Sequence, residues 1–279
     1  MKVQKMLQSL MAAVGVAWVM TSSVFAANVA KIGDTEYATL DAAISAWKEG
    51  DTIVLLSDID SNGYFVKNAD FVIDGAGKYT IKCLSPNSNY PNYFVNVASG
   101  YKQTFKNVTI DANEKVPYAI QCIGSASALT LDNVTIKGGK SMSTKGKNDS
   151  FAQTRLGYGI HVNGGKVVAN NLKVQNCTVS AGYMTGNDSN GKSPSFTLSG
   201  DECSFDLIGS SDLGSLTPTI VSTAKGCCVC DVTASYKFLG FLNRTTNMRV
   251  VTAKAWNNLI NQVGSMAEVS VTKASVKLL

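Results

Sequence analysis

Histidine, proline and charge are all scarce in this sequence. A single histidine, His161, stands among 279 residues, with five prolines and only 16% charged side chains. The low charge and a hydrophobic content of 45% exclude an intrinsically disordered chain. One histidine also leaves no ligand set at zinc spacing, although Cys227, Cys228 and Cys230 lie close together. We therefore expect a folded protein and no metal site of that kind.

A strong basic excess is missing too. The formal net charge is +5, and it falls to +3 without Lys2 and Lys5, which lie in a segment that we expect to be removed. The remaining lysines are scattered and form no basic stripe. Nucleic acid is therefore not an expected partner.

The first 26 residues have the pattern of a secretory signal. Lys2 and Lys5 give the positive start, an apolar stretch runs from Leu7 to Met20, and Val24-Phe25-Ala26 supplies small residues at the cleavage positions. A membrane anchor is the alternative, but the apolar stretch is short for a span, and no other stretch is long enough. We predict a mature chain that is secreted, periplasmic or on the cell surface, without a transmembrane segment.

Seven cysteines follow the signal segment. Export permits disulfides, but an odd number leaves at least one cysteine free or paired with another molecule. The sequence does not determine which cysteines would form disulfides. Cys122 and Cys203 lie within or beside apolar strands, where a cysteine usually acts as a small buried hydrophobe.

One short phrase recurs along the chain. Residues 107–111 read Asn-Val-Thr-Ile-Asp and residues 133–137 read Asn-Val-Thr-Ile-Lys. Looser copies begin at Asp70, Asn171, Ser195 and Asp231. Apolar residues alternate with polar ones in each copy, which predicts strands with one buried face. Repeats separated by roughly 20–50 residues indicate stacked units, because one unit cannot bury its apolar face alone.

The first residue of the phrase supports a coil of stacked strands. Asparagine tolerates turn conformations, so Asn107, Asn133 and Asn171 are expected to stack as a ladder at one corner. Val108, Val134 and Leu172 would then lie one above another in the interior. A β-sandwich is the alternative, but a sandwich gives no reason for one phrase to recur in the same phase.

The segment before the repeats predicts a capping helix. Leu40, Ala43, Ile44 and Trp47 form one apolar face, Thr39 is a plausible N-cap, and Gly50 suits the position after the helix. Such a helix would cover the open apolar end of the coil. We predict a coil with this cap over residues 27–235, and a C-terminal cap over 236–279 with a helix near 253–266.

The run from Lys31 to Asp58 and the phrase Phe71-Val72-Ile73-Asp74-Gly75-Ala76-Gly77 carry a family resemblance. They resemble the N-terminal cap and early turns of secreted bacterial proteins of the pectate-lyase-like superfamily. The resemblance implies an all-β fold, a single-stranded right-handed parallel β-helix with an N-terminal amphipathic helix. It also implies polysaccharide as the ligand class.

Catalysts of this family are lyases and hydrolases of acidic polysaccharides. Such lyases bind Ca²⁺ through carboxylates and use an Arg or Lys base, and such hydrolases use two or three Asp. In the repeat template Asp74 and Asp111 share an outward position, and Lys137 follows in the same column. At a spacing of ~4.8 Å these residues would form a charged row, either an acid–base pair or a solvated ladder.

His161 is the remaining catalytic candidate. In Gly157-Tyr158-Gly159-Ile160-His161-Val162-Asn163 the alternation predicts that His161 points outward, as a surface residue or a catalyst. The sequence contains no Asn-Thr-Asp, Asp-Asp, Arg-Ile-Lys or Arg-x-Pro-x-x-Arg motif of the enzymatic relatives. These absences favour a non-catalytic protein. No cofactor is expected, and Ca²⁺ is the one ion that the resemblance leaves open.

Three functions remain open at this stage. The leading one is an exported non-catalytic β-helix whose outer loops bind glycans or a cell surface, with loops expected at 85–92, 138–155 and 182–194. The second is a polysaccharide lyase or glycoside hydrolase. The third is a scaffold or passenger segment of a surface assembly, and the sequence leaves the oligomeric state open.

Overall fold

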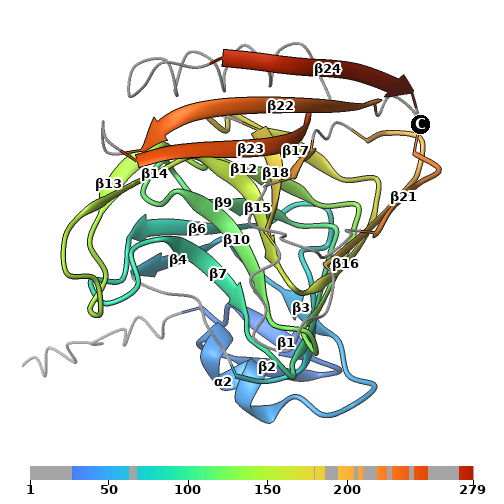
Figure 1. Ribbon diagram of the computed structural model, residues 1–279. Coiled ribbons are helices and arrows are strands. Elements are labelled where there is room, and N and C mark those ends of the chain that lie inside the picture. Colours follow the sequence, from blue (N-terminus) through green and yellow to red (C-terminus); the bar gives the residue numbers. More distant parts are fainter. Residues whose placement is uncertain are drawn as a thin grey trace, which may run out of the picture.

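The protein is almost entirely made of β-strands. The computed structural model describes residues 27–62, 68–178, 180–185, 194–203, 207–209, 219–224, 228–238, 242–250 and 270–278 (Figure 1). The predicted signal segment, residues 1–26, and the predicted helix near 253–266 lie outside these ranges. All-β architecture with one short helix is therefore confirmed for the described residues.

Three sheets carry the main body of the chain. Sheet A has the order β2 (Thr35–Tyr37), β1 (Ala30–Ile32), β3 (Ile53–Leu55), β5 (Phe71–Asp74), β8 (Lys102–Lys106), β11 (Ala128–Asp132), β16 (Lys166–Asn170), β19 (Ser195–Ser199) and β21 (Thr219–Ser222). Sheet B consists of β4 (Ile59–Asn62), β6 (Thr80–Ser85), β9 (Thr109–Asp111), β12 (Thr135–Lys137) and β17 (Lys173–Gln175). Sheet C consists of β7 (Tyr93–Val97), β10 (Tyr118–Ile123), β15 (Tyr158–Asn163), β18 (Ser180–Thr185) and β20 (Leu207–Gly209).

From β5 to β19 the chain visits these three sheets in a fixed cycle. It runs from A to B to C and back to A, as in β5–β6–β7 followed by β8–β9–β10. After β3, the strands of these three sheets pair in parallel with the preceding strand of the same sheet. This pattern of parallel sheets is compatible with a β-helix.

The repeated phrase forms the inner face of sheet B, as predicted. Val108, Val134 and Leu172 are all buried. The Thr135 N–H donates to Val108 O and the Lys173 N–H donates to Val134 O, each at 3.0 Å. The three apolar residues therefore lie directly before successive strands, β9, β12 and β17, in one interior. Burial of each side chain stabilises the fold by roughly 1.5–3 kcal/mol.

The other two sheets supply matching columns of apolar side chains to the same core. In sheet A, register places in one column Ile53, Ile73, Phe105, Leu131, Ala169 and Leu198. In sheet C the corresponding columns are Val95, Ile120 and Ile160, and Val97, Cys122, Val162 and Met184. Cys122 is completely buried, as expected of a small hydrophobe.

Left-handed asparagines form the corner before sheet B. Asn107, Asn133 and Asn171 have φ angles of 47°, 55° and 48°. Asn133 Nδ2 donates to Asn107 Oδ1 at 3.0 Å, so the predicted side-chain ladder joins these two turns. A Cβ atom on Gly200, which follows β19, would come within 2.2 Å of Asn171 Oδ1. The corner therefore needs asparagine for its conformation and glycine for its space.

The predicted capping helix exists but is shorter than expected. Helix α2 covers Leu40–Ala46, and the Thr39 hydroxyl accepts a hydrogen bond from the Ala42 N–H at 3.1 Å. Leu40 and Ile44 join the hydrophobic core. Trp47 is extended and ends the helix, so Gly50 lies in a later turn and not directly after the helix. Figure 1 places α2 at one end of the stack of strands.

Three of the proposed copies of the phrase belong elsewhere. Phe71–Asp74 and Ser195–Ser199 form β5 and β19 of sheet A, and Asp231–Ser235 lies in an antiparallel strand. Only the copies that begin at Asn107, Asn133 and Asn171 share sheet B. Alternation alone suits a strand of any sheet, whereas a left-handed asparagine at the start of the phrase distinguishes the three copies in sheet B.

Further strands interrupt or follow the cycle. The connection from β12 to β15 contains a hairpin, β13 (Met142–Thr144) and β14 (Gln153–Arg155), within the region predicted as a loop. Residues 182–185, predicted as the start of a loop, belong to β18. The chain ends in an antiparallel sheet of β22 (Cys228–Phe238), β23 (Leu242–Val250) and β24 (Ser270–Leu278). Strand β22 spans the predicted boundary at residue 235.

Candidate functional site

The connections from sheet B to sheet C stack at one corner of the molecule. Strands β9, β12 and β17 end in register at Asp111, Lys137 and Gln175. The turns that follow have left-handed backbone at Asn113, Glu114, Gly138 and Asn176, with φ angles of 51°, 55°, 82° and 53°. We call this region the B–C corner. Left-handed turns stacked in this way direct short polar side chains outward at a fixed spacing.

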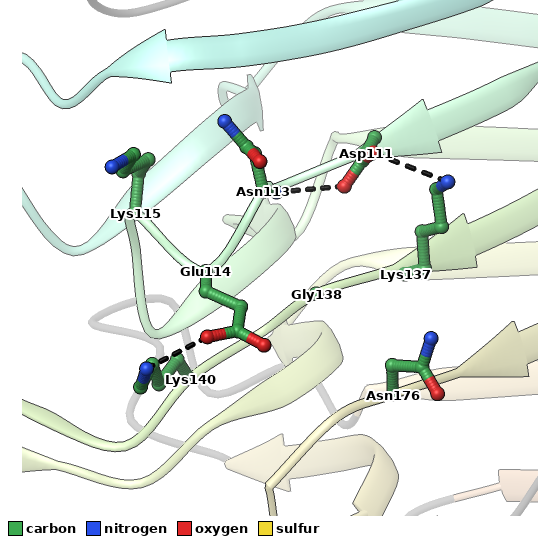
Figure 2. A pocket seen from close by; sticks show the side chains of 8 residues that line it. All are labelled: Asp111, Asn113, Glu114, Lys115, Lys137, Gly138, Lys140 and Asn176. Atoms are coloured by element: carbon green, nitrogen blue, oxygen red, sulfur yellow. Dashed lines mark hydrogen bonds and ion pairs between the residues drawn. The ribbon is translucent and has the colours of Figure 1, made fainter.

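An open hollow of about 370 Å³ lies at the B–C corner (Figure 2). It is lined by Asp111, Asn113, Glu114, Lys115, Lys137, Gly138, Lys140 and Asn176. Apart from Gly138, every lining residue carries a charge or an amide. Such a surface suits a ligand rich in hydroxyl or charged groups far better than an apolar one.

Asp111 is held from two sides. Its Oδ1 accepts a hydrogen bond from the Asn113 N–H at 2.7 Å, and its Oδ2 lies 3.2 Å from Lys137 Nζ. Lys137 is the direct register partner of Asp111 on the neighbouring strand. The ion pair is partly exposed, so its net contribution to stability is typically below about 1 kcal/mol. Its larger effect is to neutralise the carboxylate and to fix its orientation.

A second ion pair forms the opposite side of the hollow. Glu114 Oε2 lies 2.7 Å from Lys140 Nζ, and both side chains are exposed. The hydrogen bond from Lys140 lowers the pKa of Glu114, with the positive charge of Lys140 as the next cause. Glu114 is therefore ionised at neutral pH, and Figure 2 shows its carboxylate directed toward Lys140.

Lys115 gives the hollow its positive excess. Three lysines and two carboxylates line the hollow, and each carboxylate already has its own lysine. Within the described part of the chain, Lys115 forms no ion pair. The adjacent Asn113 is fixed by its Nδ2, which donates to Cys83 O at 2.9 Å. The hollow thus offers one uncompensated ammonium group and the fixed amide of Asn113.

Cys83 beneath this corner is not a nucleophile. Its side chain is fully buried, and burial raises the pKa of the thiol to about 11. The thiolate is the reactive form of cysteine, so the protonated Sγ is inert at neutral pH. Cys83 therefore packs in the core and takes no part in chemistry at the hollow.

The predicted row of Asp74, Asp111 and Lys137 is not formed. Asp74 lies in sheet A, where its Oδ1 accepts from the Ala76 N–H at 2.7 Å. Asn107 Nδ2 also contacts this carboxylate, at 3.2 Å from Oδ1. Asp74 is therefore a turn residue of another corner. Asp111 and Lys137 do come together, and the neighbour of Asp111 on the other side is Lys82.

His161 is buried, contrary to the prediction of an outward surface position. Only 8% of the residue is exposed, and it does not line the hollow. Gln121 Nε2 lies 3.1 Å from His161 Nδ1, and His161 Nε2 lies 3.0 Å from Thr185 Oγ1. Tyrosine rings also contact it, including Tyr118 with ring centroids 4.7 Å apart. Strand β15 does turn the His161 side chain away from the apolar columns, but the rings of Tyr118 and Tyr183 contact it there.

The surroundings of His161 keep it neutral. Burial is the main cause that lowers its pKa to about 3, and the charge of Arg155 is the second. If the Gln121 amide N–H donates to Nδ1, the proton of the neutral ring is on Nε2 and points to Thr185. A neutral imidazole fixed by two hydrogen bonds in this way supports the structure of sheet C.

Several residues of the hollow were not predicted from the sequence. Asn113, Glu114, Lys115 and Asn176 received no functional assignment, and Lys140 was placed only in an outer loop. The available signal was the turn after each sheet B strand, where Asp-Ala-Asn-Glu-Lys follows Ile110 and Asn-Cys follows Gln175. The spatial meeting of these turns depends on register across strands that are far apart in sequence.

The geometry of the hollow does not suit acid–base hydrolysis. Acid–base hydrolysis needs two carboxyl groups with different protonation states, whereas Asp111 and Glu114 are each bound to a lysine.

In the described residues, His, Cys, Asp and Glu form no group of three or more that could hold a metal ion. No helix in that part of the chain is long and apolar enough to span a bilayer.

Comparison of the chain with family models, curated proteins and solved structures finds no match.

Proposed function

We propose that this protein is an exported, non-catalytic right-handed parallel β-helix that binds glycans at the B–C corner. The cyclic order of parallel strands supports the helix, and the resemblance of residues 31–58 and 71–77 to pectate-lyase-like proteins supports its handedness and family. The pattern of residues 1–26 supports export.

The observation that carries the binding function is the lining of the hollow. Charged and amide side chains surround it, and stacked turns of a rigid sheet fix their positions. Hydroxyl-rich ligands are recognised by such sets of convergent donors and acceptors. The pairing of both carboxylates with lysines leaves hydrogen-bonding groups in place and removes a free acid or base.

Polysaccharide cleavage is the second candidate function. The observation that favours it is the contact of Asp111 with Lys137, since a carboxylate and a lysine are groups that a lyase would need. Against it, these two groups are engaged with each other at 3.2 Å, and neither is free to act on a substrate.

A direct test combines binding and turnover. Purified mature protein is applied to an array of acidic and neutral glycans, and each glycan that binds is then incubated with the protein and examined for unsaturated and reducing ends. We expect binding without new ends, and binding that weakens in Lys115→Gln. Lys166→Gln is the matched control, because it removes the same charge from an exposed position in sheet A.

Each contrary result has a clear meaning. Release of new ends that is lost in Asp111→Asn would establish the enzyme and overturn the non-catalytic function. Binding to no glycan would overturn the binding function and would favour a scaffold of a surface assembly. Equal weakening by Lys115→Gln and Lys166→Gln would show that only net charge matters, and would remove the hollow as the site.

A further inference from the structure

Exposed apolar side chains gather near the B–C corner. The described residues include four large exposed apolar side chains, Leu84, Tyr90, Phe151 and Val221. The first three lie at the end of β6, in the β6–β7 loop and in the β12–β15 connection, all of which belong to this corner. Single exposed apolar residues need no explanation, but clustering on one set of connections indicates a binding surface.

Tyr90 is held in place by a neighbouring ring and by a turn. Its ring stacks on Tyr93 with centroids 6.5 Å apart and 21° between the planes, yet 45% of the residue is exposed. Asn87 Oδ1 accepts hydrogen bonds from the Asn89 and Tyr90 N–H groups at 2.8 and 3.2 Å. The ring is thus presented to solvent by a formed turn and backed by a second ring.

The β13–β14 hairpin secures the same loop from the other side. Thr144 Oγ1 lies 2.6 Å from Asn92 Oδ1, and the Lys147 N–H donates to Asn89 O at 3.0 Å. Two connections far apart in the sequence therefore form one surface, which we call the Tyr90 platform and define as residues 86–92 and 144–149. A rigid aromatic surface loses little entropy on binding, which is why tyrosine is so effective at recognition sites.

The chain segments that form the platform lead directly into those that line the hollow. Asn113, which lines the hollow, bonds to Cys83 on the strand that leads into the loop at 86–92. Lys140, at the other side of the hollow, directly precedes the hairpin. One extended ligand could therefore contact both surfaces.

The composition of the platform indicates the ligand class. Asn87, Asn89 and Asn92 flank Tyr90 in the sequence, and Lys145 and Lys147 are exposed on the hairpin. The core of a protein–protein interface is depleted of charge, whereas the platform combines its one exposed aromatic ring with the charged residues Lys145, Lys147 and Asp149. Across the hollow and the platform, five lysines stand against three carboxylates. An aromatic face among amides and ammonium groups suits a sugar ring that carries negative substituents.

We infer that Tyr90 is a stacking subsite for a pyranose ring of an acidic polysaccharide, with Lys145 and Lys147 contacting carboxylate or sulfate groups of the chain. This inference rests on the proposed glycan-binding function and adds a second contact region outside the hollow. The apolar face of the sugar lies on the exposed part of the Tyr90 ring, and its hydroxyl groups reach the surrounding amides.

The test uses three oligosaccharides of equal length, an oligogalacturonate, a sulfated oligosaccharide and a neutral oligoglucoside. Calorimetric titration of the mature chain should show tighter binding of at least one acidic probe than of the neutral one. Tyr90→Ala should weaken that binding about tenfold, in the range of an aromatic contact residue. Tyr90→Phe retains the ring and should bind within about twofold of the natural protein.

Control variants separate stacking from loss of structure. Tyr101→Ala removes a half-buried tyrosine from the connection between β7 and β8, at a different corner, and should leave affinity unchanged. Saturation-transfer NMR gives a second readout, because aromatic protons should transfer signal to the sugar in the natural protein and in Tyr90→Phe. Melting temperatures of all variants show whether Tyr90→Ala is folded.

The outcomes distinguish this inference from the proposed function. Unchanged binding in folded Tyr90→Ala, with a loss in Lys115→Gln, overturns the platform and leaves the hollow as the glycan site. A natural protein that binds none of the three probes overturns this inference, whereas the proposed function is overturned only if no glycan of the array binds. Tyr90-dependent retention on cells stripped of glycans would show a protein ligand and would also overturn the inference.

Discussion

Asn133 donates a side-chain hydrogen bond to Asn107 across one turn of the chain, at 3.0 Å, while both residues hold a left-handed backbone. The same side chains therefore perform two tasks, since they tolerate the strained turn and bond the next turn. Asn133→Ala loses both, and we expect it to lower the free energy of unfolding by about 1–3 kcal/mol. Asn133→Gly keeps the backbone conformation and should cost less. Urea denaturation measures both.

Asn148 provides the control for this comparison. It is exposed in the β13–β14 hairpin and is not among the residues with positive φ. Asn148→Ala should change stability by less than about 0.5 kcal/mol. Equal stability of Asn133→Ala and Asn133→Gly would contradict a role for the left-handed conformation.

The stacked interior predicts a clear contrast between the two faces of sheet B. Leu172 is completely buried and directly precedes β17, the last described strand of sheet B. Leu172→Ala should therefore destabilise the protein by about 2–5 kcal/mol, because burial is lost and a cavity forms. Thr135 is on the outer face and is half-buried, so Thr135→Ala should cost well under half as much. Similar losses of urea midpoint in the two variants would contradict the assignment of the faces.

The sequence predicted sheet B well because two independent signals coincide there. Apolar residues alternate with period two within each copy of the phrase, and the first of them, Val108 or Val134, follows an asparagine at the corner. Asp74 shows what fails when only one signal is present. Its strand has the same alternation, but the residue before it is Asp70 and not a left-handed asparagine, and the strand belongs to sheet A. Binary alternation therefore predicts strands, and corner residues predict which sheet they join.

His161 shows the limit of a strand pattern. The period-two rule predicts that it points away from the apolar columns, but the rule does not indicate what lies outside the sheet. Tyr118, Tyr183 and Arg155 reach it from neighbouring strands and from the hairpin, contacts that depend on the whole arrangement. The ion pairs of the hollow are equally hard to predict from the sequence, because the contact of Asp111 with Lys137 depends on the strand register.

Burial of His161 makes stability depend on pH. Its pKa is about 3 in the folded protein and 6.5 as its ordinary value, so the unfolded chain binds a proton more readily. The stabilisation is complete above pH 6.5 and is lost as the pH falls from 6.5 toward 3, by up to about 1.4 kcal/mol per pH unit. Urea titrations between pH 7 and 4 should show this decline.

His161→Gln isolates that contribution. Glutamine remains neutral across this range, so the stability of the variant relative to the natural protein should improve as the pH falls. Carboxylates titrate in both proteins and cancel in the difference. Parallel stability curves for the two proteins would show that His161 contributes nothing to the pH dependence.

Substitution of the two partners in the Glu114–Lys140 ion pair should change the affinity for an acidic oligosaccharide in opposite directions. Glu114 is ionised and bound to Lys140 at 2.7 Å, so Glu114→Gln removes one negative charge and releases the ammonium group. We expect affinity for an acidic oligosaccharide to rise about threefold, with a steeper dependence on salt, because exposed charges act through a screened field. Lys140→Gln should lower the affinity, and a neutral oligosaccharide should respond to neither change.

Glu202 offers a closely matched control for this prediction. It is exposed, lies 2.7 Å from Lys173, and its pKa is likewise lowered by the hydrogen bond from that lysine. Neither Glu202 nor Lys173 lines the hollow. Glu202→Gln changes the net charge of the molecule by the same amount and should leave affinity nearly unchanged. If Glu202→Gln raised affinity as much as Glu114→Gln, the attraction would come from overall charge, and the two ion pairs of the hollow would have no specific part in recognition.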